Sequence, residues 1–529
     1  MRKAGKKVSL ILAFVLTLGM SAGLFSACGN RADAEGVLNI YIHNAGYGTD
    51  FVEPLGKIFK EKTGIEVKMS AVADNADLFT QLESGVSKAD LLFSSNSVDY
   101  YTYIQKTIGG QTYPCLLEDL TDIYKANVPG EDVTLEEKMY DEYLAHNATV
   151  KDGETKYYSV PWINGLNGIL INGETWNDAW KEPRTTNELL ELCDTIKAAG
   201  QMPFIYCLEN SYWGTAIAPA WAAQYMGEDE VALFNEGKDI QGRQYVPEIL
   251  NYQGFLEAIK VVGDLLDADK NYMHPYSMSL DFTSVQNVFL EGAEQDGNIV
   301  MMPNGDWLER EMSANYGKDE CDIRFISLPV ISSLGTKLGI TEDELCSIID
   351  YIDGKTTVEP NFASTKGLEK QEVLDAVTYA RKLNPAYSYE HEAFIPVYAQ
   401  DKEEAKQFLQ FLASDEGIEA FVRESGGYTL PYDYDYLNSE ATKNEFSAFQ
   451  KSALEIIGKS RIFEFEMKDR IFAVGGVKIP GTNISTFYET YLSANKSTVD
   501  YKSAEDVFAD DYNFVKNRWT LIKTNAGIA

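Results

Sequence analysis

The residues whose chemistry is most evident in this sequence are aromatic side chains that stand close to amides or carboxylates. Three tryptophans have such neighbours in the chain: Trp162 with Asn164, Trp213 with Asn210, and Trp307 with Asp306. Aromatic rings offer flat faces on which a ligand can stack, while planar polar groups hydrogen-bond its edges. With 32 tyrosines the chain has many further rings. We therefore expect ring platforms for a ligand; the alternative is ordinary packing in the core and on the surface.

Motifs for other kinds of chemistry are missing from the chain after residue 28. Neither G-x-S-x-G nor H-E-x-x-H occurs there, and the four histidines are scattered. We therefore predict no enzyme activity, no metal site and no cofactor. The 81 acidic residues outnumber the 46 basic ones, which gives a net charge of −35. This balance argues against a nucleic-acid partner, because phosphate binding needs clustered Lys and Arg.

Residues 1–27 have the pattern of a secretory signal peptide. Four basic residues precede the apolar run 8–20, which is too short for a comfortable membrane span, and small residues follow. The Ser-Ala-Cys that ends at Cys28 resembles a bacterial lipobox, although Phe25 stands where Leu is usual. The resemblance implies that Cys28 is acylated and becomes the mature N-terminus, with 28–36 as a tether. The alternative is an ordinary secretory signal with an incidental cysteine.

Five cysteines follow Cys28, an odd number without any C-x-x-C spacing. One disulfide, such as Cys193 with Cys207, is compatible with the sequence. We favour buried thiols, because spacing alone does not establish pairing.

Strand and helix patterns alternate at the start of the mature chain. They indicate a strand at 37–43, a helix at 51–64, a strand at 65–69, a helix at 76–84 and a strand at 89–93. This βαβαβ order predicts a parallel sheet with helices on both faces. Ligands bind at the carboxyl ends of such strands, which singles out the loops Asn44–Asp50 and Ser94–Asn96.

The stretch 156–176 marks the passage from a first domain to a second. An aromatic, Asn- and Gly-rich loop precedes the apolar run 168–171, which indicates a buried strand. Further strands are expected at 202–206, 298–302, 323–328 and 393–397, and further helices at 116–124, 185–199, 216–226, 255–267, 282–291, 402–414 and 416–425. Residues 332–389 contain helical pieces at 342–351 and 370–382, and we interpret them as an insertion on the first domain.

The order of motifs resembles the extracellular solute-binding proteins of bacterial ABC importers, in particular the large carbohydrate-binding family. Four features carry the resemblance over nearly the whole mature chain. They are the lipobox at Cys28, Tyr157–Pro161 followed by Ile169–Asn172, Phe289–Gly292 followed by Met301–Trp307, and Ala405–Leu409 followed by Ser414–Gly417. Each is weak alone, and their shared order makes the resemblance specific.

The resemblance implies an α/β fold with two lobes, each a sheet flanked by helices, and a ligand cleft between them. The chain would cross between the lobes near 161–168, 326–329 and 413–415. Lobe 1 would comprise 37–163 and 326–413, with the insertion at about 332–389, and lobe 2 would comprise 164–325 and 414–529.

The same resemblance implies a sugar site of rings for the apolar faces and planar polar groups for the hydroxyls. The predicted ligand-binding residues are Asn44, Tyr47, Asn96, Trp162, Asn164, Asn167, Asn210, Trp213, Asp306, Trp307, His391 and Tyr428. Alternative roles remain open for several of them: hinge packing for Trp162, a helix N-cap for Asp306, a simple turn for Asn164 and Asn167, and a structural role for His391.

The function expected from the resemblance is capture of a carbohydrate, in particular an oligosaccharide, by hinge closure. The protein would be a monomer, lipid-anchored on the extracellular face of a bacterial cell membrane. Its partners would be importer permease subunits with an ATPase. Two alternatives remain: the same clamp holding a polyamine, peptide or chelated metal, or a lipid-anchored glycoside hydrolase.

Overall fold

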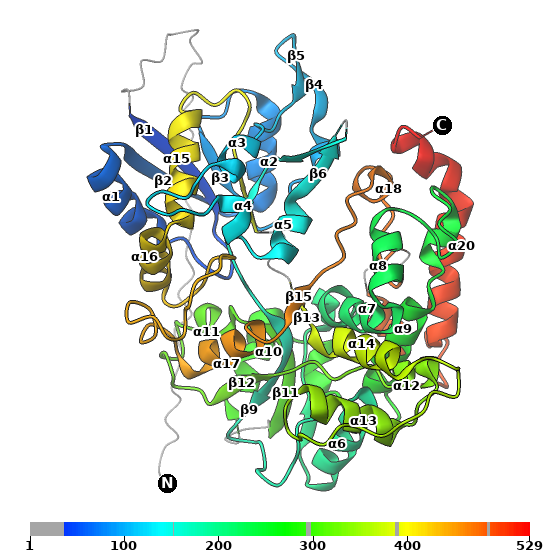
Figure 1. Ribbon diagram of the computed structural model, residues 1–529. Helices are drawn as coiled ribbons and strands as arrows, with labels where there is room; N and C mark the ends of the chain where they lie inside the picture. Colours follow the sequence, from blue (N-terminus) through cyan, green and yellow to red (C-terminus); the bar gives the residue numbers. More distant parts are fainter. Residues whose placement is uncertain (1–35, 152, 293–297, 387–390, 484–486, 529) are drawn as a thin grey trace, which may run out of the picture. The chain divides into compact units, whose positions relative to one another are not determined.

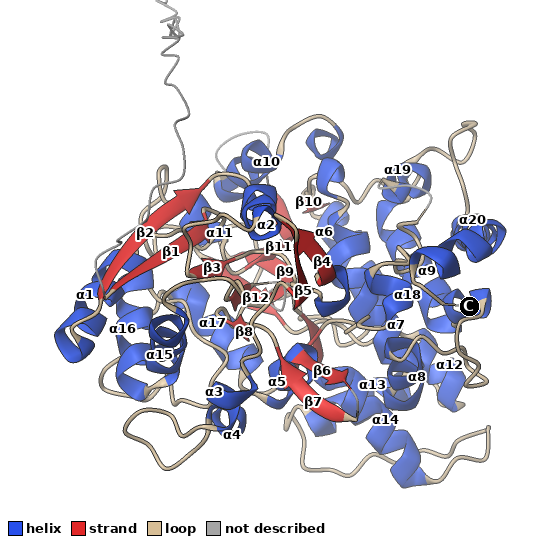
Figure 2. Ribbon diagram, turned by 90° about the horizontal axis from the view of Figure 1, so that it is seen from above, coloured by secondary structure: helices blue, strands red, loops and turns tan. Residues whose placement is uncertain are grey.

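Two main β-sheets, each flanked by helices, carry the fold in a computed structural model of the chain (Figure 1, Figure 2). The structure describes residues 36–528 apart from 152, 293–297, 387–390 and 484–486. The predicted signal peptide, Cys28 and the tether up to residue 35 lie outside the described residues. This mixed α/β architecture confirms the predicted fold class and is the one expected of a two-lobed solute-binding protein.

The first sheet contains the predicted βαβαβ unit. Its strand order is β2-β1-β3-β14-β8. The strands are β1 (Val37–His43), β2 (Glu66–Val72), β3 (Leu91–Phe93), β8 (Val160–Pro161) and β14 (Glu392–Phe394). Strand β1 pairs in parallel with β2 and β3, whereas β14 runs antiparallel to β3 and β8. Alternate residues of β1 are buried, as its sequence pattern predicts.

Helices on the first sheet begin and end where their capping residues stand. Helix α1 (Val52–Thr63) ends at Gly64, whose φ of 81° favours glycine, and α2 (Asn75–Ser84) is capped by the Asp74 side chain. Helices α15 (Lys402–Ala413) and α16 (Asp415–Ser425) pack against each other, and α16 also packs on α1 (Figure 1).

The predicted helix at 116–124 is wrong for its first half. Only α3 (Thr121–Lys125) is helical, because Leu117 forms a β-bridge with Pro396 and the Glu118 N–H donates to Ile395 O. Two hairpins nearby were not predicted: β4 (Ile104–Ile108) with β5 (Gln111–Cys115), and β6 (Ala148–Lys151) with β7 (Glu154–Tyr157). Short helices α4 (Leu135–Lys138) and α5 (Asp141–Asn147) complete this region.

The second sheet is built around β9 (Asn167–Asn172), all of whose residues are buried. Its order is β10-β11-β9-β12, with β10 (Met202–Phe204), β11 (Ile299–Gly305) and β12 (Ile323–Ile326). Strand β9 runs antiparallel to β11 and β12. A strand covered on both faces needs a continuous apolar run, which explains the sequence of 168–171. The sheet's neighbours include α6 (Thr186–Ala198), α10 (Phe282–Leu290) and α17 (Ala448–Ile457).

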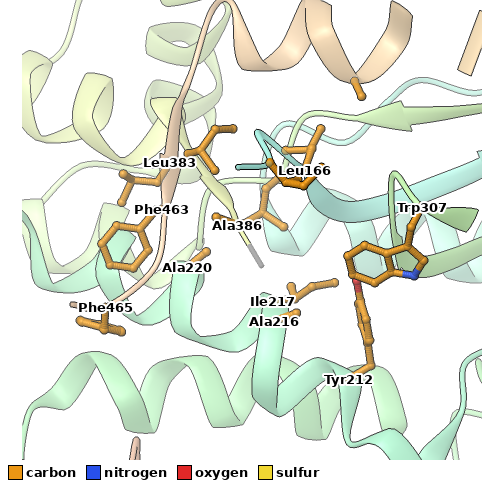
Figure 3. Close-up of a cluster of buried hydrophobic side chains, with 14 of the residues drawn as sticks. Leu166, Tyr212, Ala216, Ile217, Ala220, Trp307, Leu383, Ala386, Phe463 and Phe465 are labelled. Atoms are coloured by element: carbon orange, nitrogen blue, oxygen red, sulfur yellow. The ribbon is translucent and has the colours of Figure 1, made fainter. Parts of the chain in front are cut away.

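A large helical layer extends from the second sheet (Figure 1). Its core helices α7 (Ala218–Met226) and α9 (Gln253–Leu266) pack on each other, and α9 also contacts α20 (Ala504–Asn525). The remaining α-helices and β-strands of the described chain are α8 (Glu228–Asn235), α11 (Leu308–Glu311), α12 (Ser333–Leu338), α13 (Glu342–Ile352), α14 (Lys370–Lys382), β13 (Leu383–Pro385), β15 (Arg461–Phe463), α18 (Arg470–Ala473) and α19 (Tyr488–Ser493). Figure 3 shows part of the buried core, with Ala220 of α7, Leu383 of β13 and Phe463 of β15.

The helices of 332–389 pack on this layer. Helices α12 and α14 contact α7, Arg184 Nη1 lies 2.5 Å from Asp350 Oδ2, and Lys337 Nζ donates to Tyr225 O at 2.8 Å. These contacts favour a different division of the chain from the one expected. We propose that the described part of 332–389 belongs to the second lobe and that α16, which packs on α1, belongs to the first.

Leu170 on β9 should be the apolar position of the second sheet at which truncation lowers stability most. Leu170 is fully buried and lies opposite both Met302 and Phe325. Truncation of Leu170 to Ala should lower the free energy of unfolding by about 3 kcal/mol, because it removes apolar contacts and leaves a cavity. Urea unfolding followed by tryptophan fluorescence measures this loss. Leu521→Ala, at a position on α20 that is 59% exposed, is the matched control and should cost little. Equal losses of unfolding free energy in the two variants would contradict the placement of Leu170 in the buried core of the second sheet.

Candidate functional site

A cleft of about 920 Å³ lies between elements that belong to the two halves of the fold. From the first sheet's side it is lined by 97–101, which follow β3, by 145–150 of α5 and β6, and by Tyr158 and Ser159. From the other side it is lined by residues of α8 and by 464–469, which follow β15. A concave site of this volume can accommodate a solute of several rings.

Tyrosine rings form part of the cleft wall. Tyr100 and Tyr158 stack with ring centroids 4.6 Å apart and an angle of 26° between their planes. Tyr100 and the adjacent Tyr101 are half-buried, so parts of both rings stay accessible. The Lys151 ammonium lies 5.6 Å from the Tyr100 ring, and the Arg470 guanidinium lies 5.7 Å from the Tyr101 ring. Such a wall can stack on the flat face of a ligand.

Ionisable groups gather on the cleft lining beside these rings. Glu392 is buried and accepts a hydrogen bond from the Val98 N–H at 2.5 Å, and burial raises the pKa of its carboxyl to about 8. Burial also raises the pKa of Asp99 to about 6. Lys468 Nζ donates to Ala145 O at 2.6 Å and to Ala148 O at 2.9 Å, and burial lowers the pKa of this ammonium to about 8. The lining thus combines apolar rings with hydrogen-bonding and charged groups.

Six of the predicted ligand-binding residues meet in one buried group, which we call the aromatic cluster. Its members are Tyr47, Trp162, Asp306, Trp307, His391 and Tyr428. Its centre is Tyr47, whose ring makes edge-to-face contacts with Trp307, His391 and Tyr428 at centroid distances of 6.0, 5.0 and 4.8 Å.

One hydrogen bond of the aromatic cluster joins the two halves of the fold. The Tyr47 hydroxyl, in the loop between β1 and α1, donates to Asp306 Oδ1 at 2.8 Å, at the end of β11. Burial raises the pKa of the Asp306 carboxyl to about 7, although this hydrogen bond acts in the opposite direction. An ion pair between Arg310 Nη2 and Asp50 Oδ2 at 2.5 Å spans the same two regions. The cluster is therefore a contact between loops of the two main sheets.

Trp162 is held by the first sheet. Its indole N–H donates to Ser94 O at 3.0 Å, and its ring packs against Phe51 and Phe93. Only 3% of the side chain is exposed. These contacts favour hinge packing for this residue, and a ligand contact stays a prediction.

Asn164 lies in the connection between β8 and β9, Asn167 is the first residue of β9, and both are buried. Asn164 Oδ1 accepts from the Tyr143 hydroxyl at 3.2 Å, and Asn167 Oδ1 accepts from the Tyr212 hydroxyl at 2.5 Å. The Nδ2 groups of both residues have no hydrogen-bond partner among the described residues. Buried amide donors are normally satisfied, so these two are suited to a polar ligand.

The other four predicted residues lie apart from both the cleft lining and the aromatic cluster. Trp213 is fully buried and stacks on Trp221 with centroids 5.9 Å apart, so it belongs to the core of the helical layer. Asn44, Asn96 and Asn210 are exposed.

The residues that line the cleft were missed by the sequence prediction. The loop after β3 was singled out, but the expected contact was Asn96, and the lining begins at Ser97. The pair Tyr100-Tyr101 was a usable signal for a ring platform, because it stands in the same loop shortly after Asn96. Lys468 and Glu392 lack such a signal, since the chain brings them to the cleft from positions far along the sequence.

No disulfide and no metal-ligand cluster is found among the described residues. All five cysteines described are free thiols, and no group of three or more His, Cys, Asp or Glu there is placed to hold a metal. No helix in the described part is both long and apolar enough to cross a bilayer.

The raised pKa of Asp306 predicts a pH dependence of stability. An unfolded Asp titrates near pH 4, so between about pH 4 and pH 7 the folded protein keeps a proton that the unfolded chain has lost. The stability contributed by this proton is present at low pH and is lost as the pH rises to 7. From pH 5 to pH 7.5, wild type should lose on the order of 2 kcal/mol more than Asp306→Asn.

Urea unfolding at pH 5 and pH 7.5 measures this difference. Asp178→Asn, at an exposed position, is the control and should follow wild type. If Asp306→Asn shows the same pH dependence as wild type, the Asp306 carboxyl does not titrate as its burial requires.

Comparison with known proteins agrees with this architecture. The sequence pattern of bacterial extracellular solute-binding proteins matches residues 45–336, which is more than half of the chain. The match includes α1 and β2 to β12, the aromatic-cluster residues Tyr47, Trp162, Asp306 and Trp307, and the part of the cleft lining that precedes β14. No curated protein matches the sequence. On the family match, the chain belongs to the bacterial extracellular solute-binding proteins.

Proposed function

We propose that this protein captures a carbohydrate, in particular an oligosaccharide, in the cleft and delivers it to an ABC importer. The family supports the coarser statement, binding of a solute outside the cell for ABC transport. The observation that supports a carbohydrate in particular is the lining of the 920 Å³ cleft. Tyr100, Tyr101 and Tyr158 lie there beside carboxylates. Sugars present apolar C–H faces and hydroxyl edges, and this lining offers partners for both.

Capture by closure of the two lobes fits the position of the aromatic cluster. The hydrogen bond from Tyr47 to Asp306 and the ion pair from Arg310 to Asp50 both join the loop between β1 and α1 to the segment that follows β11, where Arg310 lies in α11. A solute that contacts both sides of the cleft favours the closed arrangement by its difference in affinity for the two states. These loop contacts would add to the stability of that closed state.

Anchoring at the membrane is proposed from the sequence. The lipobox at Cys28 supports an acylated N-terminus, which would hold the protein on the extracellular face beside the permease subunits. A lipid anchor keeps a captured solute close to its transporter and raises its effective concentration there.

Removal of the Tyr101 ring tests the cleft. Tyr101→Ala should weaken oligosaccharide binding about tenfold, because a stacking surface is lost, while Tyr101→Phe, which keeps the ring, should stay close to wild type. Isothermal titration calorimetry with the oligosaccharide that most raises the melting temperature in a screen gives both affinities.

Three results would contradict the proposed function. Unchanged affinity in Tyr101→Ala would place the sugar elsewhere. A screen in which no oligosaccharide raises the melting temperature would remove the carbohydrate proposal. Hydrolysis of an oligosaccharide by the purified protein would favour a glycoside hydrolase.

Substitution of Cys28 tests the anchor. The wild-type chain expressed in a bacterial host should fractionate with membranes, and Cys28→Ser should appear in the soluble exported fraction, because serine cannot be acylated through a thioether. Cys115→Ser, at a buried cysteine of the mature protein, is the matched control and should leave fractionation unchanged. Retention of Cys28→Ser in the membrane fraction would contradict the lipoprotein proposal.

A further inference from the structure

A second groove, of about 910 Å³, lies beside the second sheet. Its walls come from the segment 176–195, which follows β9 and enters α6, from Arg324 on β12, and from residues of 350–356 at the end of α13. The groove shares no lining residue with the cleft. It is therefore a separate concave surface of similar volume, large enough for several sugar rings.

Two tryptophans line this groove with part of each side chain accessible. Trp176 and Trp180 are half-buried, and their ring centroids are 5.5 Å apart with an angle of 89° between the ring planes. The core tryptophans Trp213 and Trp221 differ from them, because both are fully buried. Two rings at right angles form a corner in which one ring can cover the apolar face of a sugar while the other covers its edge.

Guanidinium groups beside the two rings are held in place. Arg184 donates from Nε to Glu188 Oε2 at 3.0 Å and from Nη1 to Asp350 Oδ2 at 2.5 Å, which joins the segment before α6 to α13. Arg324 pairs with Glu182 at 3.3 Å, and its guanidinium carbon lies 5.6 Å from the centre of the Trp176 ring. Groups fixed in this way lose little conformational entropy when a ligand binds.

The charges of the groove favour a neutral ligand with many hydroxyls. The lining contains four basic and five acidic side chains, so neither an anion nor a cation is strongly preferred. Asp178 and Glu191 are exposed there, and neither forms an ion pair with a described residue. Carboxylates accept hydrogen bonds from hydroxyl groups, and guanidinium groups donate to them. Rings for apolar faces and fixed polar groups for hydroxyls are together the chemistry that recognises a sugar.

We propose that this groove is a second carbohydrate-binding site, which holds a neutral oligosaccharide or the end of a polysaccharide chain. Sugar rings stack on Trp180 and Trp176, Asp178 and Glu191 accept from their hydroxyls, and Arg184 donates to them. The inference goes beyond the proposed function, because a sugar bound here lies outside the cleft from which the solute is delivered.

Fluorine NMR of the protein labelled with 5-fluorotryptophan reads the groove directly. The probes are the β-1,4-linked tetramers of glucose, xylose and mannose and the α-1,4-linked tetramer of glucose. At least one tetramer should shift the resonances of Trp176 and Trp180, assigned by single Trp→Phe substitutions, with a Kd of about 1 mM or below. Trp519, half-buried on α20, should keep its resonance position.

The outcomes at the groove and at the cleft are separable. The shifts of Trp176 and Trp180 should persist in Tyr101→Ala, the variant expected to weaken binding in the cleft. If a tetramer binds by calorimetry and neither groove resonance shifts with any tetramer, the groove inference is overturned and capture in the cleft stands. Shifts at the groove without any binding in the cleft would overturn the proposed function and leave this inference standing. If no tetramer binds at all, the groove inference is overturned as well.

Two variants locate the contacts in the groove. Trp180→Ala should weaken the affinity read at Trp176 at least tenfold, because a stacking surface is lost, and Glu191→Gln should weaken it about threefold, because a charged acceptor is lost. Trp519→Phe removes a half-buried indole whose N–H donates to Tyr245 O at 2.9 Å, and as the matched control it should bind like wild type. Unchanged affinity in both groove variants would overturn the assignment.

Discussion

The short connection between β8 and β9 constrains the rest of the structure. Only residues 162–166 separate the edge strand of the first sheet from the central strand of the second. A connection of five residues leaves little freedom in how the two sheets are placed relative to each other. The connection is further tied to later segments, because the Trp162 N–H donates to His391 O and the Asn164 N–H donates to Thr429 O. It is therefore both a covalent link and a packed part of the contact between the sheets.

This constraint explains why polar and aromatic residues gather beside the connection. His391, which accepts from Trp162, is followed directly by Glu392, which lines the cleft. His391, directly before β14, thus belongs to the aromatic cluster, and Glu392, the first residue of β14, belongs to the cleft lining.

Sequence patterns predicted the parts of the fold that depend on local order. The βαβαβ unit, β9 and α14 follow from hydrophobic periodicity and capping residues, and their observed bounds lie within a few residues of those expected. Tyr47, Asp306 and Trp307 were singled out because each follows a predicted strand, and the structure brings the three together in the aromatic cluster. Contact of these residues with a solute remains a prediction.

The cleft itself could not be predicted in the same way. Its walls come from 97–101, 145–150 and 464–469, and the last of these lies more than 300 residues from the others. The packing of α12 and α14 on α7 depends on the tertiary structure in the same sense, whereas the Gly109-Gly110 turn between β4 and β5 is a local hairpin signal that the sequence offered. The burial that raises the pKa of Glu392 could not be predicted from the residues next to it in the sequence.

Hydrogen–deuterium exchange with and without a saturating oligosaccharide tests the central claim most directly. If the solute binds in the cleft and draws its two sides together, backbone amides of 97–101 and of 464–469 should both become protected, together with the loop 44–50 of the aromatic cluster. Protection limited to a distant surface, such as the groove around Trp176 and Arg324, would contradict the account.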